Sequence, residues 1–88
     1  MRRIPIEDAF DLHSFLPRDV ASVAEEYLRE ALEAGLREVR LIHGKGGGVR
    51  RAQVRRLLQS HPAVVDFFDA PPERGGMGAT VVILNAPS

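Results

Sequence analysis

The stretch that decides the fold reads VRLIHGKGGGVRRAQVRRLL and occupies residues 39–58. Its apolar start, 39–42, predicts a strand, and 49–59 predicts a helix. Glycines between these two elements permit positive φ and a close approach of the backbone to a ligand. The helix start adds unpaired N–H groups at the positive end of the helix dipole. A strand, a cationic glycine loop and a helix in this order indicate a phosphate-binding site.

The segments before this stretch predict one strand and one helix. Apolar and polar residues alternate over 9–13, which is typical of a strand with Phe10 and Leu12 on one face. Pro17 suits the first turn of a helix, whose apolar stripe recurs at three- and four-residue steps until Gly35 ends it. After the second helix, which Pro62 stops, we expect a strand at 64–68, a loop at 71–78 and a strand at 79–84.

This order, β-α-β-α-β-β, predicts an α/β fold. The two β-α-β crossovers imply parallel pairing with right-handed connections, and the last connection is expected to be a longer hairpin. With two helices to cover four strands, we expect a two-layer sandwich with a mixed sheet. Because 88 residues allow one modest core, we expect a single domain over 1–88 with its core at about 9–85. The strand order stays open.

Composition narrows the class of protein. Hydrophobic residues make up 44% and charged residues 27%, as in an ordinary soluble globular chain. The sequence has no cysteine, which excludes disulfides and thiolate metal sites. It has no apolar stretch long enough to span a membrane and no signal-peptide core, so we expect no membrane partner and a cytoplasmic location.

The charges are balanced overall but unevenly distributed. Twelve basic and twelve acidic residues give a net charge of zero. Residues 40–56 contain no Asp or Glu, whereas acidic residues gather in 19–38. A neutral chain of this kind can present one strongly basic face, which attracts a polyanion. The basic residues of this segment are Arg40, Lys45, Arg50, Arg51, Arg55 and Arg56.

Two histidines stand at the ends of the first two expected strands. Ligands tend to bind where parallel strands leave a sheet, so His13, His43 and the glycine loop would share one rim if these strands are neighbours. Imidazoles titrate near neutrality, and this pair would divide general-base and general-acid roles in phosphodiester cleavage. Asp11 lies on the same strand face as His13, where it would orient that ring or help to hold a metal.

The glycine loop differs from the two familiar nucleotide-binding loops. Walker A requires a glycine where this chain has Val39, and a serine or threonine where it has Gly46. The Rossmann pattern requires a third glycine where Val49 stands. We therefore expect no nucleotide cofactor.

Three segments together resemble the small MutS-related (Smr) domain family: Asp11-Leu12-His13, 43–48 with a following arginine, and 75–80. The family's hallmarks are D-L-H-G, H-G-x-G-x-G and G-G-x-G-A-T. The resemblance implies a β-α-β-α-β-β sandwich and nucleic-acid-directed activity, commonly nicking, in recombination, repair or RNA processing. It places functional roles on Asp11, His13, His43, Gly44, Gly46 and Gly48. Ser14 and Met77 depart from the pattern, since the first motif has glycine there and the third often a large aromatic.

The sequence thus predicts an endonuclease that acts on DNA or RNA, with Mg²⁺ or Mn²⁺ as the candidate metal. A non-catalytic nucleic-acid-binding module is the main alternative, and a protein-interaction domain, or a protein partner beside the nucleic acid, is a further one. The expected catalytic residues are Asp11, His13 and His43. The expected phosphate-binding residues are Gly44, Lys45, Gly46, Gly47, Gly48, Arg50, Arg51 and Arg55.

Overall fold

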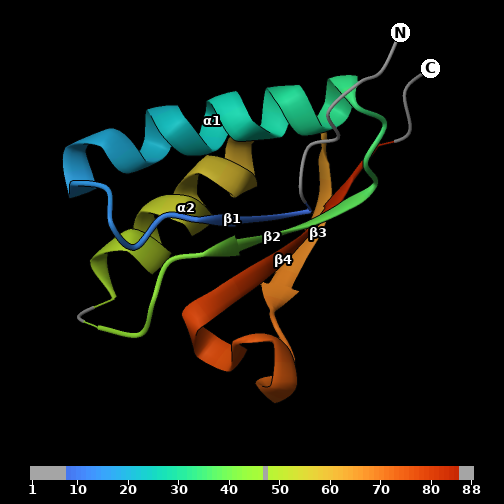
Figure 1. The fold of residues 1–88 in the computed structure, drawn as a ribbon. Helices are drawn as coiled ribbons and strands as arrows, with labels where there is room; N and C mark the ends of the chain where they lie inside the picture. The colour runs from blue at the N-terminus through green and yellow to red at the C-terminus, as the bar shows by residue number, and fades with distance from the viewer. Residues whose placement is uncertain (1–7, 47, 86–88) are drawn as a thin grey trace, which may run out of the picture.

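Helices and strands alternate along the chain in a computed structural model, which describes residues 8–46 and 48–85. Gly47, one of the expected loop residues, lies outside the described residues. The observed order confirms the predicted β-α-β-α-β-β (Figure 1). The elements are β1 (Ala9–Asp11), α1 (Pro17–Glu33), β2 (Glu38–Ile42), α2 (Val49–Ser60), β3 (Val64–Asp69) and β4 (Ala79–Leu84), with short 3₁₀ turns at Pro72–Arg74 and Gly76–Gly78.

The sheet is four-stranded and mixed, in the order β1-β2-β4-β3. β1 pairs with β2 in parallel, and β4 runs antiparallel to both β2 and β3. Parallel pairing is therefore confirmed for the first crossover and wrong for the second, because β4 lies between β2 and β3. The apolar sequence of β4 agrees with its place: five of its six residues are buried, which suits a strand that has neighbours on both edges. The expected hairpin between β3 and β4 is confirmed.

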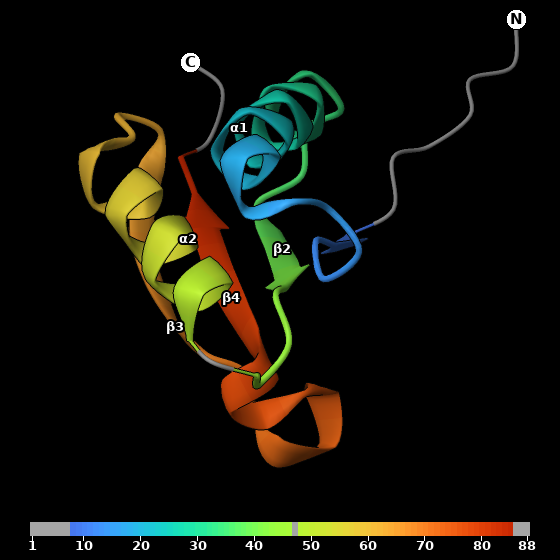
Figure 2. The same ribbon diagram turned by 90° about the vertical axis from the view of Figure 1, so that its left-hand side faces the viewer.

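Both helices cover the same face of the sheet, which gives the predicted two layers (Figure 2). The apolar stripe of α1 and the inward side of α2 meet alternate residues of β2 and β4 in one core cluster. Neither helix is long and apolar enough to cross a membrane. Fully buried members of this core include Val20, Ala24, Leu28, Val39, Leu41, Val54 and Val82.

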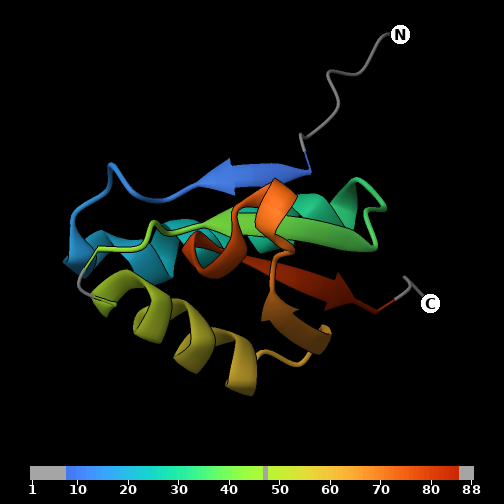
Figure 3. The ribbon, with the colours of Figure 1, turned by 90° about the horizontal axis from the view of Figure 1, so that it is seen from below.

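The strand directions bring several chain segments to one rim of the sheet. β1, β2 and β3 run the same way, so their carboxyl ends meet there, beside the start of the antiparallel β4. Seen from below, the glycine loop and the 3₁₀ turns both lie toward this end of the strands (Figure 3). Gly48, with φ of 76°, makes the turn from the loop into α2.

Candidate nucleic-acid interface at the sheet rim

Asp11 and His13 form a hydrogen-bonded pair at the end of β1. Asp11 is the last residue of the strand, and His13 lies in the turn after it rather than within it. Oδ1 of Asp11 accepts the backbone N–H of His13 at 2.9 Å and also contacts Nδ1 of the His13 ring. The backbone hydrogen bond is the main reason that the pKa of Asp11 is lowered. An ionised Asp11 therefore holds Nδ1 protonated, and Nε2 is the ring nitrogen left to act as a base.

The side chain of His13 is 63% exposed and lies against the glycine loop. A Cβ added to Gly44 would be 3.6 Å from the Cβ of His13, which is ordinary van der Waals contact. β1 and β2 are adjacent in the sheet, as expected, and this pairing places His13 beside the loop. Lys45 is also exposed, and no hydrogen bond or ion pair engages its side chain within residues 8–46 and 48–85.

The glycine loop is docked onto the turn before β4. The carbonyl oxygen of Gly78 accepts the backbone N–H groups of His43 at 3.0 Å and Gly44 at 2.9 Å. A Cβ added to Gly78 would lie 3.2 Å from Cγ of Lys45, so the Lys45 side chain would have to shift slightly. The first loop and the third glycine segment therefore form one structural unit.

His43 is buried below the loop rather than facing solvent. His43 is 3% exposed, and both of its ring nitrogens form hydrogen bonds within the protein. Nδ1 donates to the carbonyl oxygen of Gly44 at 3.0 Å, so Nε2 accepts from Oγ1 of Thr80 at 2.9 Å. Burial lowers the pKa of His43, and the ring is neutral. The structure therefore places only one of the two imidazoles, that of His13, at the solvent-facing surface of the rim.

Arg50 ties α2 to the turn that carries His13. Its Nε and Nη2 both donate to the carbonyl oxygen of Phe15, at 3.0 and 2.8 Å. One turn further along α2, Nε2 of Gln53 donates to the carbonyl oxygen of Pro17 at 2.8 Å. These hydrogen bonds hold α2 against the segment that leads into α1. Arg50, expected at the phosphate, instead has much of its guanidinium committed to this turn.

Arg51 and Arg55 share one carboxylate. Both donate through Nη2 to Oδ1 of Asp69, at 2.9 and 2.6 Å. The guanidinium of Arg55 also lies over the ring of Phe67, 5.5 Å from its centroid. The hydrogen bond from Arg51, followed by that from Arg55, lowers the pKa of Asp69, so the carboxylate stays ionised. The two arginines lie near the rim as expected, but they are not free cations.

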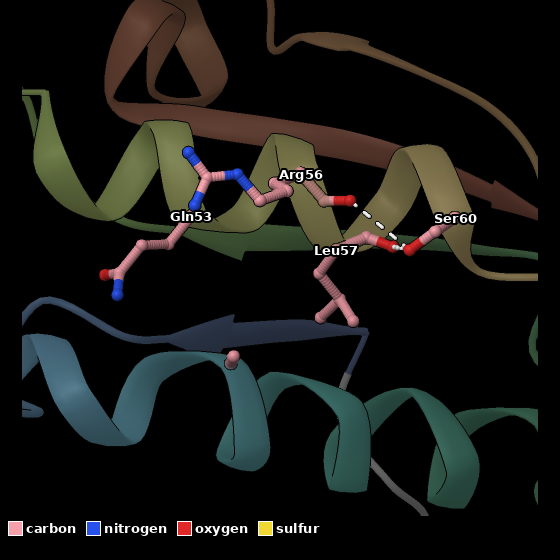
Figure 4. Close-up of a pocket in the computed structure, with 5 residues that line it drawn as sticks. Gln53, Arg56, Leu57 and Ser60 are labelled. Carbon is pink, nitrogen blue, oxygen red and sulfur yellow. Dashed lines mark hydrogen bonds between the residues drawn. The ribbon is translucent and has the colours of Figure 1, made fainter.

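Arg56, on the same helix, belongs to a different surface. It lines a hollow of about 220 Å³ between α1 and α2, together with Ala21, Gln53, Leu57 and Ser60 (Figure 4). The hydroxyl of Ser60 turns back to the helix carbonyls of Leu57 and Arg56, at 3.3 and 3.5 Å. Arg56 therefore serves as a matched control for the arginines of the rim.

Few side chains that could bind a metal gather in the described part of the rim. Within the described residues, no three His, Asp or Glu side chains converge in a way that could hold a metal ion. Asp11 has already committed Oδ1 to His13.

The contacts of several residues that shape the site could not be predicted from the sequence. Phe15 and Gly78 accept their hydrogen bonds through backbone oxygens. Gly78 and Thr80 fall within the 75–80 segment that resembles the family hallmark, but that segment does not reveal their partners. Thr80 and Asp69 meet their partners only across the folded chain. A carboxylate at the end of β3, followed by the hairpin to β4, was the one available sign that the basic helix faces an acidic group.

Known proteins resemble this chain in sequence. A family model described as "Smr domain" matches residues 10–85. Endonuclease MutS2 of Helicobacter pylori is 38% identical over 74 residues, which are 84% of this chain and 10% of that protein. Endonuclease MutS2 of Clostridium tetani is 37% identical over 84 residues, which are 96% of this chain and 11% of that protein. The chain spans about a tenth of the length of these curated relatives.

Solved structures show the same fold. The crystal structure of the Smr domain of Thermus thermophilus MutS2 superposes with a TM-score of 0.86 at 38% identity, and covers 90% of this chain and 99% of that one. The crystal structure of YdaL, described as a stand-alone small MutS-related protein from Escherichia coli, has a TM-score of 0.84 at 30% identity, covering 89% and 64% of the two chains. The predicted α/β sandwich is thereby confirmed.

Proposed function

Because the chain belongs to the Smr domain family, we propose that it binds nucleic acid at the sheet rim and cleaves one backbone strand there. The observation that carries this proposal is the solvent-exposed His13, oriented by Asp11 and packed against the glycine loop. The names of the MutS2 relatives, which contain the word endonuclease, agree with the reaction proposed.

The chemical step uses Nε2 of His13 as a general base. It accepts a proton from a water molecule as the water oxygen bonds to phosphorus, and the bond from phosphorus to one ester oxygen breaks. That leaving oxygen takes its proton from solvent. Asp11 remains ionised and stabilises the imidazolium that forms. With RNA, the same base would deprotonate the 2′-hydroxyl, which attacks the adjacent phosphorus to leave a cyclic phosphate and a free 5′-hydroxyl.

The phosphate is bound by the loop and the start of α2. Lys45 supplies a full positive charge from the exposed loop. The first-turn N–H groups of α2 have no intrahelical acceptor, and Gly48 brings no side chain to cap them. The positive end of the helix dipole points the same way. These donors stabilise the charge that develops on phosphorus-bound oxygens in the transition state.

A plasmid assay tests the proposal. Supercoiled DNA is incubated with the purified chain in Mg²⁺, in Mn²⁺ or in EDTA, beside His13→Ala and the control His61→Ala. We expect open circles from wild type and from His61→Ala, and their loss with His13→Ala. A labelled single-stranded RNA is tested in parallel for ends that carry a cyclic phosphate. Absence of cleavage of both substrates in all three buffers would contradict the endonuclease.

The burial of His43 favours a second candidate, a nucleic-acid-binding module without catalysis. Only one imidazole reaches the surface of the rim, so no second histidine protonates the leaving oxygen. Such a module would bind DNA or RNA with a steep salt dependence carried by Lys45, and would leave the plasmid supercoiled. The two candidates differ in strand scission and agree in binding.

A further inference from the structure

Arg51, Arg55 and Asp69 form an ion triad in which two positive charges face one negative charge. Two guanidinium groups converge on a single oxygen, Oδ1 of Asp69, so the triad has a net charge of +1. Within the described residues, Oδ2 of Asp69 accepts no hydrogen bond. The Nε atoms of both arginines are also buried, and no atom of residues 8–46 and 48–85 accepts a hydrogen bond from them. Asp69 therefore satisfies part of the hydrogen-bonding capacity of the two arginines and leaves part unused.

The triad stands at the edge of the proposed site. Arg51 lies in the first turn of α2, directly after the glycine loop, and both arginines are near enough to His43 to lower its pKa. Asp69 ends β3 and stands opposite Thr80, the partner of His43. The side chains of Arg51, Arg55 and Asp69 are 31%, 27% and 39% exposed, so an anion from solvent can reach them.

A phosphate group matches this triad better than the carboxylate does. Two arginine forks present several donors in fixed directions, and a phosphodiester offers two unesterified oxygens that share a negative charge. Asp69 presents one oxygen to both forks. Its carboxylate has the same charge as a backbone phosphate, so the two compete for the same donors.

We propose that Asp69 is a built-in competitor of the substrate: it occupies Arg51 and Arg55 in the free protein, and a backbone phosphate takes its place when nucleic acid binds. This inference rests on the proposed function and specifies how the site limits its own affinity. The competition keeps the arginines in place and weakens binding, which makes Asp69 a determinant of affinity rather than a catalytic residue.

The test compares Asp69→Asn with Asp66→Asn. Asp66 is an exposed carboxylate on the same strand, and within the described residues its side chain accepts only the backbone N–H of Phe67. Its substitution therefore makes the same change in net charge without touching the arginines. Binding to a fluorescent duplex and to a single strand is measured by anisotropy over a salt series. Exposed ion pairs are worth about 0.2–1 kcal/mol, so Asp69→Asn should bind up to about five-fold more tightly. Its log–log salt slope should steepen by up to about 0.9 on duplex or 0.7 on single strand.

A second background separates the triad from overall charge. In Arg51→Gln/Arg55→Gln, the added Asp69→Asn should give no gain beyond that of Asp66→Asn. Circular dichroism confirms that each variant is folded, and Asp69→Ser replaces Asp69→Asn if the latter is not. Equal affinities of the Asp69 and Asp66 variants, with a wild type that binds, would overturn the competition alone. Loss of binding in wild type itself would overturn the proposed function and this inference with it.

Discussion

The imidazole of His43 accepts a hydrogen bond through Nε2 from the hydroxyl of Thr80, 37 positions away, at 2.9 Å. Nδ1 of the same ring donates to the carbonyl oxygen of Gly44, so the ring joins β4 to the first residue of the glycine loop. This pairing uses both nitrogens of a buried side chain. The two histidines of the rim therefore differ in role: His43 supports the glycine loop, and His13 faces solvent.

Replacing Thr80 by valine should destabilise the fold. The substitution keeps the shape of the side chain and removes the donor, which leaves Nε2 of His43 buried without a partner. An unsatisfied buried acceptor costs about 1–3 kcal/mol in unfolding free energy, measurable by urea denaturation. Thr80→Ser keeps the hydroxyl and should lose less. Equal urea midpoints for wild type and Thr80→Val would show that the hydrogen bond contributes nothing.

The stability of the protein should fall as the pH drops below about 6.5. The pKa of His43 is lower in the folded chain, chiefly because the ring is buried, so the unfolded chain takes up the proton first. Stability from this group is complete above the unfolded pKa of about 6.5 and is lost as the pH falls toward the folded one. Asp11 and Asp69 also have lowered pKa values, but carboxylates act only below about pH 4.

Urea denaturation at pH 7.5 and pH 5 measures this effect. His43→Gln should be less stable than wild type at pH 7.5 and should lose less stability between the two pH values, because no imidazole is left to titrate there. His61→Gln serves as the control and should keep the wild-type pH dependence. A His43→Gln variant with the full wild-type loss would assign the effect to other groups.

Removing the Arg50 clamp should slow the chemistry more than it weakens binding. Arg50→Ala deletes two hydrogen bonds to Phe15, which hold the turn that carries His13. A displacement of about 1 Å in a reacting group can cost on the order of 10²-fold in rate. We expect the single-turnover nicking rate to fall about 10-fold or more. The slope of log affinity for DNA against log salt should change by less than the loss of one phosphate contact would cause.

Arg56→Ala removes the same charge from the neighbouring surface and is the control. If Arg50→Ala and Arg56→Ala reduced nicking equally, the loss would come from the change in net charge, and if Arg50→Ala lost only affinity, Arg50 would be a phosphate ligand. Either result would contradict the role of Arg50 as a clamp. Arg50→Lys distinguishes the two further, because an ammonium keeps the charge but lacks the fork that reaches Phe15 twice.

Glycine substitutions should rank by local geometry. Gly75 has φ of 118°, and an added Cβ would lie 2.9 Å from Cβ of Ala79. Gly75→Ala therefore combines backbone strain with a steric clash and should cost about 1–3 kcal/mol. Gly35 has φ of 83° in open space, so Gly35→Ala should cost about 1 kcal/mol. Gly46 has neither constraint, and thermal unfolding of Gly46→Ala should match wild type; the reverse order would contradict this ranking.

Local patterns in the sequence predicted most of the helices and strands. Helical periodicity together with Pro17 and Gly35 located α1, and the observed α2 begins at the predicted Val49. The position of β4 was not predictable in the same way. Two crossovers imply parallel neighbours, and nothing local shows that the last strand will enter between β2 and β3. Its near-continuous apolar run was the signal of a central strand.

The position of the candidate site could be predicted from the sequence, but the burial and the partners of its side chains could not. Spacing from the ends of β1 and β2 located His13 and His43 at one rim. Which of them would be buried depends on Thr80, and which arginines are free depends on Asp69, 18 positions from Arg51 and 14 from Arg55. Partners so far apart in the chain produce no periodic pattern in the sequence. The sequence therefore predicted two catalytic histidines, whereas the structure exposes one of them.

The most direct test compares His13→Ala with His43→Gln in single-turnover nicking, normalised to the folded fraction of each protein. A general base contributes about 10²–10⁴-fold, so His13→Ala should lose at least two orders of magnitude in rate while its urea midpoint stays near that of wild type. His43→Gln should lose stability and keep a rate within a few-fold of wild type. Wild-type nicking by His13→Ala, with activity abolished in folded His43→Gln, would contradict the assignment of the base to His13.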